Sequence, residues 1–134
     1  MKKIMFTLLS VLLLAACSSK EQTGLKEALT VKLQDDQDLK DYKLDPKEVA
    51  ACVEKAISDG LPGIPGDPRR PQYYEAYAKF VSVNSPGDAE AAVQQYKDLF
   101  GGIKQAHEAA NTITDHIMTC MGTAIEQHGG EREK

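Results

Sequence analysis

Three side chains of this sequence could together bind a metal ion. His116 and Cys120 lie four residues apart, so on a helix both would face the same way. Together with Cys52 they would offer one imidazole and two thiolates, a soft ligand set that suits copper or zinc. The same two cysteines could instead bond to each other. Which of these happens depends on the compartment in which the protein folds.

A second polar group follows one edge of the same C-terminal stretch. His107, Asn111 and Asp115 repeat every four residues, and a His–Asp pair can serve acid–base catalysis. A solvent-exposed flank of a helix explains this spacing more simply. The sequence also contains no nucleophile motif, phosphate-binding loop or paired-carboxylate signature. We therefore predict no catalytic residues.

The compartment is indicated by the N-terminus, which has the organisation of a secretory signal. Lys2 and Lys3 give it a positive start, and residues 4–16 form an apolar run. This run is too short to cross a hydrocarbon core of about 30 Å, which requires roughly twenty apolar residues. It has the length of a cleaved signal and ends in Leu14-Ala15-Ala16-Cys17.

Leu14-Ala15-Ala16-Cys17 resembles the lipobox of bacterial lipoproteins. In that family the cysteine sulfur receives a diacylglycerol, the signal is cut before the cysteine, and the new amine is acylated, commonly with palmitate. The resemblance implies that residues 1–16 are removed and that Cys17 carries a covalent lipid. Ser18, where an Asp would favour the inner membrane, implies an outer-membrane anchor facing the periplasm. We therefore expect the bacterial membrane to be one partner.

An extracytoplasmic location also indicates whether Cys52 and Cys120 bind a metal or form a disulfide. In an oxidising compartment an isolated pair of cysteines is usually a disulfide. A Cys52–Cys120 bridge would close a loop of about 68 residues and stabilise the fold by about 4 kcal/mol. Because it would consume both sulfurs, we predict no metal site. The lipid on Cys17 is the only added group that we expect.

Residues 45–128 have the pattern of an all-α domain, a small bundle of about four helices clamped by that disulfide. Asp45-Pro46 and Ser85-Pro86 each supply an N-cap followed by a proline in the first turn. Gly60 and Gly101 are placed to end helices. The expected helices cover approximately residues 45–60, 72–83, 85–100 and 103–127.

The segments on either side of this domain are predicted to lack a fixed fold. Residues 17–44 are mostly polar, and we expect a flexible tether with a reach of about 90 Å when extended. Within it, Leu25, Leu29 and Leu33 repeat like a helix, whereas Leu29, Val31 and Leu33 alternate like a strand, so the pattern assigns neither. Residues 129–134 are expected to form a disordered tail.

The connection between the first two helices of this domain is the best candidate for a partner-binding site. Prolines recur there at every third residue, the period of a polyproline II helix, although a structural connector is the simpler interpretation. Arg and Tyr, which are enriched in binding hot spots, come directly after it. Tyr73 and Tyr77 fit the buried stripe of the next helix, which leaves Tyr74 for the surface. The candidate contact residues are Pro65, Pro68, Arg69, Arg70 and Tyr74.

The charge of the chain narrows the class of partner. Without Lys2 and Lys3, 14 of the 16 basic residues remain against 20 acidic ones. An acidic chain without a basic stripe argues against nucleic acid as a partner.

Three functions fit these features. We predict first a non-catalytic protein that binds another envelope protein, an adaptor whose architecture resembles that of the secretion pilotins. A periplasmic inhibitor or immunity protein that blocks an enzyme, and a carrier of metal or a small ligand, are the alternatives.

Overall fold

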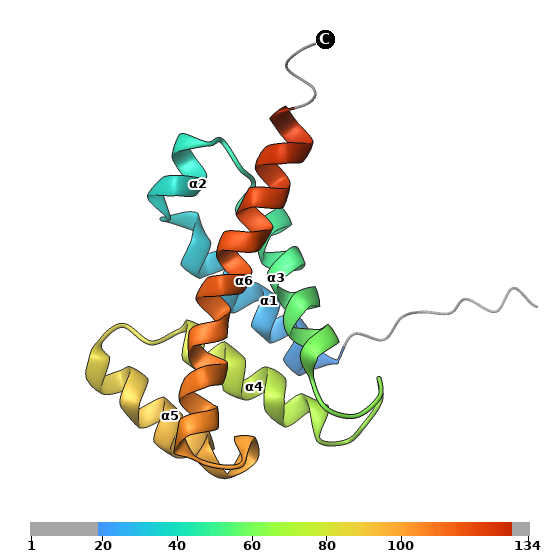
Figure 1. The fold of residues 1–134 in the computed structure, drawn as a ribbon, viewed down its shortest axis with the longest axis vertical. Helices are drawn as coiled ribbons and strands as arrows, with labels where there is room; N and C mark the ends of the chain where they lie inside the picture. The colour runs from blue at the N-terminus through green and yellow to red at the C-terminus, as the bar shows by residue number, and fades with distance from the viewer. Residues whose placement is uncertain (1–18, 130–134) are drawn as a thin grey trace, which may run out of the picture.

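The computed structural model describes residues 19–129, and the regular structure in this part of the chain is entirely helical (Figure 1). The predicted all-α class is thereby confirmed. The helices are α1 (Lys20–Gln34), α2 (Gln37–Asp41), α3 (Pro46–Gly60), α4 (Arg70–Val81), α5 (Pro86–Phe100) and α6 (Ile103–Gly129). The lipobox with Cys17, and residues 130–134 of the predicted tail, lie outside the described residues. Gly129, expected in that tail, is the last residue of α6.

The four expected helices are present, and α3 and α5 begin at the capping residues that predicted them, whereas α4 covers residues 70–81 instead of 72–83 and has no side-chain cap. The Asp45 carboxylate accepts a hydrogen bond from the Lys47 N–H at 2.9 Å at the start of α3. The Ser85 hydroxyl accepts one from the Asp88 N–H at 3.1 Å at the start of α5. Gly101 adopts a φ of +91° and closes α5 in the left-handed conformation that glycine tolerates best.

The prediction of a flexible tether is wrong for most of residues 17–44, because α1 and α2 occupy this segment. Leu25 and Leu29 are fully buried and Leu33 is 2 % exposed, whereas Val31 is 66 % exposed. The four-residue repeat is therefore the correct pattern, and its leucines form one stripe of α1. The domain thus contains six helices over the described residues instead of four.

Helix α1 packs against both α3 and α4, and α6 packs against α3 and α5. The α1 leucines share one continuous core with Val49 and Val53 of α3 and with Ala106 of α6. In Figure 1, α2 lies toward the C-terminal end of α6, whereas the loop between α3 and α4 lies beside the start of α1. Among the described helices, none is long and apolar enough to cross a membrane.

The predicted disulfide is confirmed and links α3 to α6. Cys52 and Cys120 are bonded, and their Cα atoms lie 5.9 Å apart. Cys120 is buried whereas Cys52 is exposed at the surface. The bridge therefore clamps the first predicted helix to the last, and both sulfurs are consumed.

An aromatic cluster joins α4 to α5. Phe100 lies edge-on to Tyr73 and Tyr77, with ring centroids 5.3 and 5.7 Å apart, a favoured arrangement for aromatic pairs. The Tyr73 hydroxyl donates a hydrogen bond to the Leu99 carbonyl at 3.0 Å. Burial raises the pKa of the Tyr77 hydroxyl, because the charged phenolate would lose hydration at this site. Tyr73 and Tyr77 thus pack against the core, as predicted.

Candidate functional site

Residues 61–69 connect α3 to α4 and form a surface segment that we call the proline loop. Its backbone forms two successive turns, in which the Asp67 N–H donates to the Ile64 carbonyl and the Arg70 N–H to the Asp67 carbonyl, each at 3.0 Å. Gly66 has a φ of +93° after Pro65, the pattern of a type II turn. The segment is therefore a turn-forming connector, the simpler of the two interpretations, and not a polyproline II ridge, since a left-handed glycine breaks that extended backbone.

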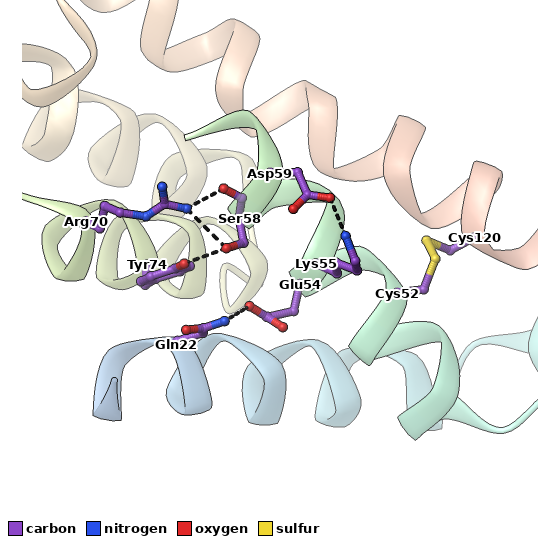
Figure 2. A network of polar contacts seen from close by, with 9 residues as sticks. All are labelled: Gln22, Cys52, Glu54, Lys55, Ser58, Asp59, Arg70, Tyr74 and Cys120. Carbon is purple, nitrogen blue, oxygen red and sulfur yellow. Dashed lines mark hydrogen bonds and ion pairs between the residues drawn. A yellow bond between two sulfur atoms is a disulfide. The ribbon is translucent and has the colours of Figure 1, made fainter. Parts of the chain in front are cut away.

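Arg70 ties the proline loop to the end of α3, and Figure 2 shows its contacts with Ser58. Its side chain is buried and donates hydrogen bonds to the Ser58 carbonyl, the Ser58 hydroxyl and the Gly63 carbonyl, the last at 3.2 Å. Ser58 lies in the last turn of α3, whose carbonyls lack partners within the helix and carry partial negative charge. The guanidinium thus satisfies the helix end and ties the loop to it.

The prediction that Tyr74 lies at the surface is wrong. Tyr74 is 4 % exposed, and its hydroxyl shares a hydrogen bond of 2.7 Å with the Ser58 hydroxyl (Figure 2). The physical reason is that α4 packs against α1 as well as α5, so it has two buried sides. Arg70 is buried because the end of α3 and the proline loop lie against the start of α4. Neither side chain can therefore provide the main contact of a partner.

The other three candidates remain at the surface of the proline loop. Pro65, Pro68 and Arg69 are exposed. The Arg69 side chain pairs with Asp67 at 3.2 Å, and this contact, together with the Arg69 backbone N–H, lowers the pKa of the Asp67 carboxyl. The carboxylate accepts the Arg69 backbone N–H at 2.9 Å and so helps to hold the second turn in place.

The most exposed apolar group of the proline loop is Ile64, which the sequence pattern does not single out. Ile64 is 75 % exposed and stands between two prolines that limit the backbone around it. Nearby, Gly63 has a φ of +80°, and a Cβ there would lie 2.5 Å from an Asp67 oxygen. The two turns and the Asp67 contacts thus order the loop, in a conformation that requires glycine at position 63, while it presents an apolar side chain to solvent.

A surface hollow of about 480 Å³ separates the proline loop from the first turn of α1. Ser19 and Gln22 line it on one side, and Pro65, Gly66 and Pro68 on the other. Gln22 donates a hydrogen bond to the Glu54 carboxylate, which joins α1 to α3 beside this hollow (Figure 2). The start of α1 and the proline loop therefore lie side by side.

Among the described residues, the structure does not assemble a metal site or a catalytic site from the two groups of polar residues centred on α6. Cys52 and Cys120 form the disulfide, so the soft metal site with His116 is not assembled, and the described residues contain no group of three or more suitable ligands. His107 lies at the surface and pairs with Glu90 of α5, with 3.3 Å between its Nε2 and a carboxylate oxygen. This edge of α6 is a solvated flank.

No protein-family model, curated protein or solved structure matches this chain. A function must therefore be inferred from the fold and from the geometry of the proline loop.

Replacing Arg70 with alanine should lower the free energy of unfolding by about 2 kcal/mol, because the partly buried carbonyls of Ser58 and Gly63 would lose a charged donor. Urea unfolding followed by circular dichroism measures this change. Arg69→Ala is the matched control at the next position, and it should change stability little, because Arg69 is exposed. Equal effects of the two substitutions would contradict the anchoring role of Arg70.

Proposed function

We propose that this protein is a lipid-anchored protein of the bacterial outer membrane that faces the periplasm and acts by non-catalytic binding to another envelope protein. The lipobox-like Leu14-Ala15-Ala16-Cys17 supports the anchor. The disulfide is consistent with folding in an oxidising compartment. The proline loop supports the binding role.

The observation that carries the binding role is the exposure of Ile64 on a preorganised loop. Ile64 is 75 % exposed, while the turns, the Asp67–Arg69 pair and Arg70 fix the backbone beneath it. A segment that is already ordered loses little conformational entropy on binding, so more of its contact energy contributes to affinity. The proline loop is thus suited to insert Ile64 into an apolar pocket of a partner.

A rigid exposed loop also suits an inhibitor that enters the cleft of a periplasmic enzyme, the second candidate function. The adaptor and the inhibitor would bind different partners, but both would use the same residues of the proline loop. A carrier role has less support, because both thiols that would bind a soft metal form the disulfide.

Substituting Ile64 with aspartate should abolish partner capture, because a carboxylate would be forced into an apolar pocket. The measurement is in-cell crosslinking of the tagged, full-length chain, with identification of the adducts by mass spectrometry. Val31→Asp is the control, since Val31 is similarly exposed at 66 % but lies on α1 outside the proline loop. Adducts that survive Ile64→Asp and disappear with Val31→Asp would move the binding site to α1.

A further inference from the structure

The position of α1 limits how far the folded domain can stand from its anchor. Ser19 caps α1, with its hydroxyl accepting a hydrogen bond from the Gln22 N–H at 3.1 Å. Only Ser18 separates this residue from Cys17. Two residue steps span at most about 7 Å, whatever their conformation. A lipid on Cys17 would therefore hold the start of α1 at the membrane surface.

The proline loop lies at this same end of the domain. Ser19 lines the hollow whose opposite wall is Pro65, Gly66 and Pro68. Figure 1 shows the loop between α3 and α4 beside the start of α1, with α2 and the end of α6 lying away from it. A Cys17 anchor would thus place Ile64 close to the lipid headgroups.

We infer that the partner of the proline loop is a protein embedded in, or anchored to, the same membrane leaflet, with an apolar pocket near the level of the headgroups. This inference rests on the proposed function, since it requires both the lipid on Cys17 and protein binding by the loop. A freely diffusing enzyme would need a loop that projects into the periplasm, and the short distance from Cys17 to Ser19 does not provide one. The geometry therefore favours the adaptor over the inhibitor.

The test lengthens the connection between lipid and domain. A photo-crosslinking amino acid at position 64 of the full-length lipidated chain reports the partner in cells. Twelve Gly/Ser residues inserted between Ser18 and Ser19 would let the domain move away by about 20 Å. The same insertion after Gly130 is the control, because it leaves the distance from Cys17 to α1 unchanged. Labelled palmitate must be incorporated equally by all versions.

We expect an adduct with a protein that has its own membrane-spanning segment or lipid. The insertion between Ser18 and Ser19 should lower the yield of this adduct about tenfold, and the control insertion should leave the yield unchanged. The loss arises because the local concentration of the loop at the membrane falls as the connection lengthens. A protein adduct whose yield is unchanged by that insertion, or whose partner has no membrane attachment, overturns this inference and leaves the proposed function standing. If position 64 forms no adduct with a protein, or forms one with lipid alone, both this inference and the proposed function are overturned.

Discussion

Replacing Cys52 and Cys120 together with alanine is expected to lower the free energy of unfolding by about 4 kcal/mol. The disulfide joins residues 68 positions apart, and a cross-link over such a loop removes about this much conformational entropy from the unfolded chain. Alanine is suitable at both places, because Cys120 is buried and Cys52 is exposed without a required polar contact. Urea unfolding monitored by far-ultraviolet circular dichroism gives the difference directly.

Reduction of the unaltered protein provides the control for this measurement. Because Cys52 is exposed, a small thiol reductant can reach the bridge in the folded state, and reduction should reproduce most of the loss. The double-alanine variant should not respond to the reductant. Identical urea midpoints for the oxidised and reduced wild-type protein would show that the bridge contributes nothing to stability.

The features of this fold that can be predicted are those whose signals are local. Each N-cap lies within three residues of the N–H whose hydrogen bond it accepts, as with Asp45 and Ser85, so the sequence alone locates the start of α3 and α5. The pairing of Cys52 with Cys120 is equally predictable, because only two cysteines remain if Cys17 belongs to the proposed anchor.

The apolar pattern of residues 20–34 does not by itself assign helix α1, because its buried stripe is narrow. Only Leu25, Leu29 and Leu33 are buried, and Val31 on the opposite side produces a false strand-like alternation. A usable signal is present at the start of the helix. Ser19 and Gln22 have the spacing of a capping box, and the Ser19 hydroxyl does accept the Gln22 N–H.

The incorrect predictions at the candidate site arise from the missing α1 and from the loop geometry. The sequence pattern assigns Tyr74 to the surface only because residues 17–44 are taken as a tether, which leaves its side of α4 without a packing partner. The burial of Arg70 depends on the end of α3 lying next to the start of α4, a tertiary contact that no local pattern reports. Ile64 stands out only when the turns on both sides are known, since a single apolar residue in a loop is ordinary.

Leu29→Ala is expected to lower the free energy of unfolding by about 3 kcal/mol. The Leu29 side chain is fully buried in the core that α1 shares with α3 and α4, and its truncation removes transfer free energy and leaves a cavity. The residue belongs to the segment that composition alone would describe as a tether, so the measurement tests the position of α1 directly. Urea unfolding of the oxidised protein gives the value.

Val31→Ala is the matched control, since it lies two residues further along the same helix and is 66 % exposed. It should change stability by less than about 0.5 kcal/mol, as surface substitutions usually do. If Leu29→Ala were equally silent, residues 20–34 would not belong to the core, and a long flexible segment would again separate Cys17 from the domain. The proline loop could then reach far from the membrane, and a soluble partner would become the better candidate. The stability of this one helix therefore decides which class of partner the anchored domain can meet.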